Sequence, residues 1–230
     1  MHHRIFIDAI QPTVIVGGDE FHHSIRVVRL REGEAVEVFD RSGKMAHAIV
    51  ESIAKDHAVL NIGDEIASRE SSLDVTLAMA IIQLEKFELV LQKATELGVR
   101  SIIPLVTDRI ELRAERYAGR HERWERIVFE AVKQSGRSVV PTIESPTSFD
   151  DAIARAGFKI LCDADVPPSA AQPRDRATIF VGPEGGWSER ELALARDHDA
   201  HFQRLGPRRL RAETAAIAAL AIITARFGDL

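Results

Sequence analysis

The feature that most constrains this chain is an alternation, from Leu73 onward, of short apolar runs with longer segments whose apolar residues recur at helical spacing. Such an alternation is typical of an α/β domain, in which helices connect the strands of a mostly parallel sheet. We therefore expect an α/β domain over residues 73–230. Its expected strands are Leu73–Ala80, Ser101–Val106, Lys159–Asp163, Thr178–Val181 and His201–Leu205.

Four segments of this part of the chain are predicted to be helical, and one of them is Glu189–Arg196. The apolar residues of Lys86–Leu97 fall on one face, and Gly98 supplies a left-handed stop after it. Arg120–Ser135 repeats the pattern. The last helix, from about Arg211 to Arg226, is apolar nearly all round, so we expect it to be buried in the core or against a second subunit.

Residues 1–70 have a different texture, because short extended segments alternate with turns that contain glycine. Asp19 stands where a short helix would begin and is expected to be its N-cap. The polar run Ser68–Ser72 separates this part from the next. We expect a small β-barrel or sandwich with strands at Arg4–Ile7, Ala35–Phe39, Ala46–Ile53 and Ala58–Ile62.

The composition excludes several classes of protein. Lys and Arg number 30 against 35 Asp and Glu, and the resulting net charge of -5 argues against a polybasic nucleic-acid binder. Positive charge is nevertheless concentrated in residues 22–31 and 204–211, so the average charge does not describe every part of the surface. The single cysteine, Cys162, cannot form an internal disulfide, and no apolar stretch is long enough to span a bilayer. We therefore expect a cytoplasmic protein with no membrane segment.

The sharpest local signal is the segment Val181–Ser188, which lies between an expected strand and a helical run. Its three glycines and one proline define a tight loop whose backbone can approach a ligand closely, and Ser188 can cap the next helix. Loops at the carboxyl ends of parallel strands are where open α/β sheets bind ligands. The segment matches neither GxGxxG nor GxxxxGK[ST], so a structural turn and a ligand loop both stay open.

A second junction of this kind is Leu205–Ala215, which follows another expected strand. Four arginines fall between positions 204 and 211 with no acid among them. By itself the segment is compatible with a solvated basic loop before a buried helix. Glu213 would then lie in the first turn of that helix and interact favourably with its dipole.

Five segments, in this order, resemble the motifs of the RsmE family within the SPOUT class of S-adenosylmethionine (SAM)-dependent methyltransferases. Residues 22–29 are similar to the family's N-terminal His…V-L-R stretch, and residues 92–98 match its Q-K-A-T-E-L-G helix end. Residues 134–137 match its Q-S-x-R segment. Residues 182–186 and 210–215 correspond to its two cofactor motifs. The resemblance extends over nearly the whole chain.

The resemblance implies a C-terminal SPOUT domain with a deep trefoil knot, over residues 73–230, and a PUA-like β-barrel that binds RNA, over residues 1–70. It implies a homodimer that uses SAM, without a metal, to methylate N3 of a specific uridine in 16S ribosomal RNA of the small ribosomal subunit. The SAM pocket would lie in the knot at the dimer interface. Its expected residues are Leu161, Cys162, Gly182, Pro183, Glu184, Gly185, Gly186, Leu205, Gly206, Leu210 and Thr214.

Methylation of N3 requires that the enzyme align the uridine nitrogen with the donor methyl group and help to remove the N3 proton. The candidates for taking this proton or stabilising the uracil anion are Arg137, Arg211 and Glu213, and the sequence does not choose among them. The uridine must be exposed in a loop or splayed from structured RNA. The residues expected to contact RNA are His22, Arg26, Arg29, Lys86, Arg109 and Arg208.

Other hypotheses stay open. The chain could be a SPOUT enzyme that modifies another ribosomal or transfer RNA nucleotide, or an RNA-binding dimer without catalysis. A nucleophilic Cys162 is disfavoured because it has no evident partner base, and a metal at His22-His23 because no third ligand is suggested. The chain also departs from the family pattern. Gln83–Glu85 replaces a frequent Lys-Gly-Asp, Lys133 replaces an acid, and Arg209 replaces an apolar residue.

Overall fold

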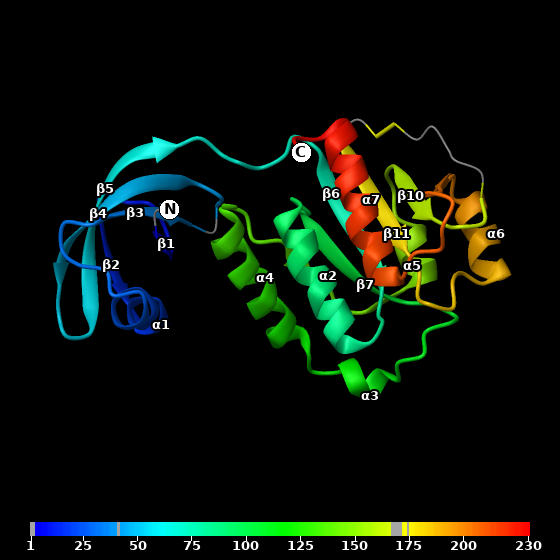
Figure 1. Ribbon diagram of the computed structural model, residues 1–230, viewed down its shortest axis with the longest axis horizontal. Helices are drawn as coiled ribbons and strands as arrows, with labels where there is room; N and C mark the ends of the chain where they lie inside the picture. Colours follow the sequence, from blue (N-terminus) through cyan, green and yellow to red (C-terminus); the bar gives the residue numbers. More distant parts are fainter. Residues whose placement is uncertain (1–2, 41, 167–171, 174) are drawn as a thin grey trace. The chain divides into compact units, whose positions relative to one another are not determined.

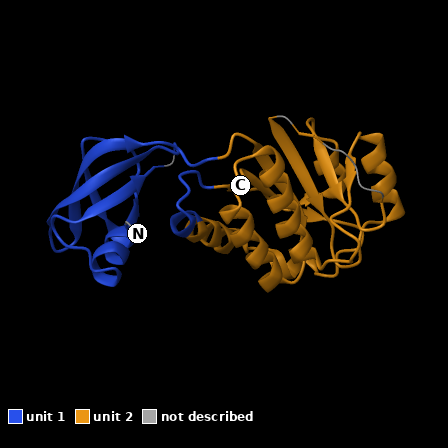
Figure 2. Cartoon of the chain, turned by 45° about the horizontal axis from the view of Figure 1, so that its top comes forward, with its two compact units in different colours: residues 1–70, 132–140 blue, residues 71–131, 141–230 orange. Residues whose placement is uncertain are grey.

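The computed structural model describes residues 3–40, 42–166, 172–173 and 175–230. The chain divides into two compact units (Figure 2). The first unit contains residues 1–70 and 132–140, and the second contains residues 71–131 and 141–230. That residues 132–140 belong to the first unit was not expected from the sequence.

The first unit is built on a five-stranded sheet with the strand order β1-β3-β4-β5-β2. β1 pairs with β3 in parallel, and the other neighbours are antiparallel. Because β1 and β2 end this order without pairing to each other in the described residues, the predicted barrel is an open half-barrel. The strands are β1 (His3–Phe6), β2 (Thr13–Gly17), β3 (Ala35–Phe39), β4 (Met45–Ile53) and β5 (His57–Ile66).

A short helical segment follows β2, formed by α1 (Gly18–Phe21) and a π-helical turn, η1 (His22–Val27). The expected cap at Asp19 was wrong, because Gly17 occupies the N-cap and Asp19 lies in the first turn without a capping hydrogen bond. Arg29, just after η1, has φ of 66°, in the left-handed region that few residues other than glycine adopt.

Residues 132–140 are held in the first unit by buried polar contacts. Arg4 donates hydrogen bonds of 2.9 Å and 2.6 Å to the backbone oxygens of Val132 and Arg137. The guanidinium of Arg137 in turn donates to Glu70, with 2.6 Å between Nη2 and Oε2. Oε1 of Glu70 also accepts the backbone N–H groups of Ser138 and Val139. The partners Arg4 and Glu70 are distant in sequence from this segment.

The second unit contains a seven-stranded sheet with the order β12-β10-β11-β6-β7-β8, in which β9 also pairs with β7. Every pairing described in it is parallel, so the predicted α/β class with a mostly parallel sheet is confirmed. All five expected strands form, whereas β8 and β9 are too short to show as apolar runs. The strands are β6 (Asp74–Ala80), β7 (Ser101–Val106), β8 (Thr142–Ile143), β9 (Thr147–Ser148), β10 (Lys159–Cys162), β11 (Arg176–Val181) and β12 (His201–Gln203).

Helices cover this sheet. α2 and α7 lie side by side in front of it in the view of Figure 1. α5 and α6 pack together in a core cluster with the buried Phe180 of β11. No helix in the described ranges is long and apolar enough to cross a membrane. The helices are α2 (Leu84–Glu96), α3 (Ala114–Tyr117), α4 (His121–Ser135), α5 (Phe149–Ile153), α6 (Glu189–Asp197) and α7 (Ala212–Phe227).

The register of the sheet brings three strand ends together. Cys162, the last residue of β10, is aligned with Val181 of β11 on one side and with Gln203 of β12 on the other. The loops that follow these three strands therefore leave the sheet at the same edge. The trefoil knot stays a prediction.

Candidate functional site

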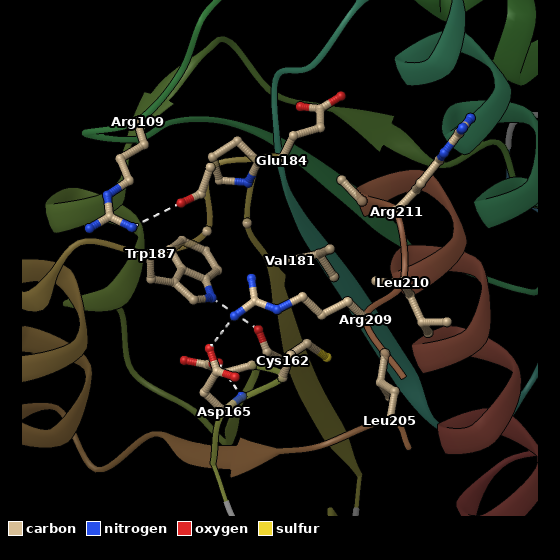
Figure 3. A pocket seen from close by; sticks show the side chains of 18 of the residues that line it. Arg109, Cys162, Asp165, Val181, Glu184, Trp187, Leu205, Arg209, Leu210 and Arg211 are labelled. Carbon is tan, nitrogen blue, oxygen red and sulfur yellow. Dashed lines mark hydrogen bonds and ion pairs between the residues drawn. The ribbon is translucent and has the colours of Figure 1, made fainter. Parts of the chain in front are cut away.

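A cavity of about 470 Å³ lies at this shared edge (Figure 3). Its lining comes from the end of β10 and the loop after it (residues 162–165), from the end of β11 and the segment after it (residues 181–187, 189 and 192), from the segment after β12 (residues 205–206, 208–212 and 215), and from Arg109 after β7. Val181, Leu205 and Leu210 give it apolar walls. Pockets of this volume hold ligands the size of cofactors.

The buried ring of Trp187 ties two of these loops together. Its Nε1 donates a hydrogen bond of 2.9 Å to the backbone oxygen of Cys162. The face of the ring lies against Gly182, where an added Cβ would come within 3.0 Å of Cε2. The close approach of the indole therefore requires glycine at position 182.

The other two glycines of the loop meet different demands. A Cβ on Gly185 would lie 3.2 Å from the Cβ of Arg109, and the backbone oxygen of Gly185 accepts a hydrogen bond of 2.9 Å from Nη1 of Arg109. Gly186 has φ of 68°, in the left-handed region that favours glycine. The loop is thus fixed by close packing at two positions and by backbone conformation at a third.

The start of α6 is fixed to the loop after β7. Ser188 is the N-cap of α6 in a capping box with Glu191, as its place in the sequence predicts. Glu191 is fully buried, and its two oxygens accept the backbone N–H groups of Ser188 at 2.8 Å and Asp108 at 2.9 Å. Hydrogen bonds from Arg190 and Ser188 also hold the pKa of Asp108 below its ordinary value. Arg109, the next residue, is thereby held at the cavity wall.

Charges of both signs surround the cavity. Nη2 of Arg209 lies 2.8 Å from Oδ2 of Asp165, and this ion pair joins the loop after β12 to the loop after β10 (Figure 3). Lys86 of α2 pairs with Glu184 at 3.3 Å. The cavity can therefore accept a ligand that carries both positive and negative groups.

Nine of the eleven residues expected to bind the cofactor line the cavity, and Leu161 and Thr214 do not. Successive side chains on a strand point to opposite faces, so Leu161, next to Cys162, is buried in the core cluster with Phe180. Thr214 is exposed on the first turn of α7. The sequence does not determine which face of β10 carries Leu161 or which side of α7 carries Thr214.

Among the candidate catalytic residues, Arg211 lines the cavity and the other two lie elsewhere. Glu213 is partly buried, and its Oε2 is enclosed without a hydrogen-bond partner among the described residues. Residues that are two positions apart in a helix point in directions about 200° apart, so Glu213 and Arg211 face different ways. Arg137 is 4% exposed and is bound to Glu70 in the first unit.

The residues expected to contact RNA fall into two groups. Arg109 and Arg208 line the cavity, and Lys86 lies beside it through its pair with Glu184. His22 and Arg26 belong to η1 of the first unit. Arg29 follows η1 in its left-handed conformation.

Cys162 lines the cavity but is poorly suited to act as a nucleophile. Burial raises the pKa of its thiol to about 12, and nearby Asp163 adds to the shift. The reactive thiolate is therefore scarce near neutral pH. Within the described ranges, no group of three or more His, Cys, Asp or Glu side chains could hold a metal ion.

Sequence reasoning missed three residues that shape the cavity. Trp187 lies inside the glycine-rich motif but was given no role. Asp165 follows the polar end of an expected strand, and an acid at that edge of a parallel sheet is the signal that could have found it. Arg209 was counted among the four arginines of its segment and noted as a departure from the family pattern, but it was given no role.

Comparisons with known proteins bear on this site. Residues 69–224 match the RNA methyltransferase domain family, and residues 16–63 match the RNA methyltransferase PUA domain family. The chain is 31% identical over 230 residues to the ribosomal RNA small subunit methyltransferase E of Bacillus subtilis, with 93% of this chain and 90% of the relative aligned.

Two solved structures resemble the whole chain. One is the ribosomal RNA small subunit methyltransferase E of Neisseria gonorrhoeae bound to S-adenosyl methionine, with 30% identity and a TM-score of 0.91. The other, from Legionella pneumophila, is in complex with the bound cofactor SAM and has 32% identity and a TM-score of 0.89. Each comparison covers 100% of both chains. This chain therefore belongs to the ribosomal RNA small subunit methyltransferase E (RsmE) family.

Proposed function

We propose that this protein transfers the methyl group of SAM to N3 of a uridine in 16S ribosomal RNA, at the position numbered 1498 that the family resemblance implies. The observation that carries the proposal is the cavity at the carboxyl ends of β10, β11 and β12, in a chain whose structural relatives, aligned over 100% of both chains, hold SAM. The first unit contributes the RNA-binding residues His22, Arg26 and Arg29.

The cavity suits SAM in size and in chemistry. Val181, Leu205 and Leu210 offer apolar surface to the adenosine, and the backbone of residues 182–186 and 205–210 offers amide and carbonyl groups to its edges. Asp163 and Glu184, which also line the cavity, complement a cation. When bound, SAM supplies a methyl group activated by a positively charged sulfonium.

Arg211 is the candidate that we assign to the reacting base. Arg211 belongs to the cavity lining and its side chain points away from the centre of the cavity (Figure 3), so its guanidinium can stabilise the negative charge that develops on a uracil approaching from outside as the N3 proton leaves. An arginine remains protonated throughout, so the proton passes to another acceptor, such as water. Arg137 and Glu213 have no place in the cavity lining.

We further propose that the protein is a cytoplasmic homodimer. α7 buries Ala216, Leu220 and Ile223 in its own unit. Ile217 and Ile222, on the two flanks of this buried stripe, remain partly exposed. A second copy of the chain would cover this apolar surface.

The decisive experiment is methyl transfer from labelled SAM to isolated small ribosomal subunits and, separately, to naked 16S ribosomal RNA, with the product nucleoside identified by mass spectrometry. N3-methyluridine is the expected product. A different methylated nucleoside would establish the alternative of a SPOUT enzyme with another target. Calorimetry without any heat of SAM binding would establish instead a non-catalytic RNA-binding dimer.

A further inference from the structure

The ion pair between Arg209 and Asp165 occupies an unusual place. Its two residues come from different loops, both line the cavity, and Nη2 of Arg209 is 2.8 Å from Oδ2 of Asp165. Figure 3 shows the Arg209 side chain extended across the cavity toward Asp165, whereas Arg211 points away from its centre. The pair therefore lies where part of a bound ligand would lie.

The two members of this pair can release each other and bind a ligand instead at little cost in free energy. The side chains of Arg209 and Asp165 are 80% and 73% exposed, and ion pairs that are exposed to this much solvent contribute little to stability. The guanidinium of Arg109 is bound differently, because it donates to the backbone oxygen of Gly185 and its Cβ packs on that glycine. Arg209 is thus available to a ligand in a way that Arg109 is not.

The position of Asp165 is fixed by its own turn. The backbone N–H of Asp165 donates a hydrogen bond of 2.8 Å to Oδ1 of Asp163, two residues earlier. This local bond holds the loop after β10 with the Asp165 carboxylate beside the cavity. The backbone that carries one half of the pair is therefore positioned before any ligand arrives.

We propose that Arg209 and Asp165 bind the amino-acid end of SAM, with Arg209 taking its carboxylate and Asp165 its ammonium group. The inference rests on the proposed function and deepens it. The amino-acid end is a zwitterion, and an arginine with a carboxylate is its charge complement. The planar guanidinium matches a carboxylate in a bidentate arrangement, which an apolar residue at this position could not provide.

Calorimetry with two ligands tests the assignment without reference to activity. S-adenosylhomocysteine contains the amino-acid end, and 5′-methylthioadenosine lacks it. We expect Arg209→Met to weaken S-adenosylhomocysteine binding by about tenfold, the loss of one charge-assisted contact, and to leave 5′-methylthioadenosine binding unchanged. Asp165→Asn is expected to show the same selectivity for S-adenosylhomocysteine.

Arg176→Met is the matched control. Arg176 forms another exposed pair, with 3.6 Å between its Nε and Oδ2 of Asp74, and neither residue lines the cavity. We expect this variant to bind both ligands like the wild type. A loss of affinity in this control would mean that removal of a surface arginine outside the cavity is enough to weaken binding.

Three outcomes would overturn the inference. Equal loss of affinity for both ligands in Arg209→Met would mean that the residue shapes the cavity as a whole. Unchanged binding of S-adenosylhomocysteine, with weaker binding of RNA, would make Arg209 a phosphate contact. Failure of the wild type to bind either ligand would refute the proposed function itself, and so differs from the first two results.

Discussion

The indole nitrogen of Trp187 donates its hydrogen bond to the backbone oxygen of Cys162, and this contact joins the glycine-rich loop to the end of strand β10. The ring is 6% exposed and packs against Phe149, with 5.0 Å between ring centroids. One buried aromatic side chain thus links two walls of the cavity to the core. The shape of the cavity should depend on it.

Trp187→Phe keeps most of the ring but removes the donor and leaves the Cys162 carbonyl without this partner. We expect the free energy of unfolding to fall by about 1–3 kcal/mol, as for an unsatisfied buried acceptor, and S-adenosylhomocysteine to bind several-fold more weakly. Chemical denaturation and calorimetry measure the two effects.

Trp124→Phe is the control for this substitution. Trp124 is buried on α4, and its Nε1 has no hydrogen-bond partner among the described residues. Its replacement should therefore leave ligand affinity unchanged. Wild-type affinity in Trp187→Phe as well would show that the bond to Cys162 does not shape the cavity.

Glu191 provides a second test of the cavity wall. Glu191→Ala leaves the N–H groups of Ser188 and Asp108 without their buried acceptor, and we expect a loss of about 2–4 kcal/mol in unfolding free energy. Glu191→Gln retains one oxygen and should lose less. Thermal denaturation of both variants checks the order, and equal stability of the two would contradict this account.

Much of the second unit could be predicted because its strands are buried. Ser101–Val106 forms with the bounds that the sequence predicts, since a strand covered on both faces is a continuous apolar run. The N-cap at Ser188 could also be predicted, because it depends only on residues that are close in the sequence. The side-chain direction of Leu161 was not available, because an apolar run shows that a strand exists without showing which of its residues face the cavity.

Contacts between residues that are distant in the sequence could not be predicted either. Arg137 looked catalytic within a short polar motif, yet its position is decided by Glu70, 67 residues away in the sequence. The pair of Arg209 with Asp165 spans 44 residues. Helical or strand periodicity carries no information about such pairs.

Arg211 is expected to act on the reaction and little on cofactor binding. Arg211→Met should lower kcat by about 100-fold, the usual effect of removing one group that stabilises developing charge. Arg211→Lys should restore part of the rate, because it returns the positive charge. Steady-state kinetics with calorimetry decide the point, and a variant that loses S-adenosylhomocysteine affinity while keeping kcat would make Arg211 a cofactor contact instead.

Cys162 should be dispensable for methyl transfer. Since burial raises the pKa of its thiol to about 12, the group is neutral at pH 8 and should react slowly with iodoacetamide in the folded protein and rapidly after denaturation in urea. Cys162→Ala should keep its activity. Complete loss of methyl transfer, with S-adenosylhomocysteine binding intact, would revive the nucleophilic route.

The pair of Glu70 with Arg137 predicts how the first unit responds to acid. Burial raises the pKa of Glu70, but the hydrogen bond and charge of Arg137, together with the N–H groups of Ser138 and Val139, outweigh it and hold this pKa below its ordinary value. A lowered folded-state pKa stabilises the fold above the unfolded value of about 4.3, and the stabilisation is lost as the pH falls through the folded-state pKa.

Glu70→Gln should therefore flatten the acid-side decline of stability below about pH 5, measured by urea denaturation followed by circular dichroism at a series of pH values. Glu51→Gln, at an exposed position of β4, is the control and should decline like the wild type. Arg137→Met leaves the Glu70 carboxylate buried without its guanidinium partner, so we expect it to cost about 3 kcal/mol at pH 7. If Glu70→Gln and the wild type lose stability in parallel as the pH falls, the ion pair does not hold residues 132–140 in the first unit.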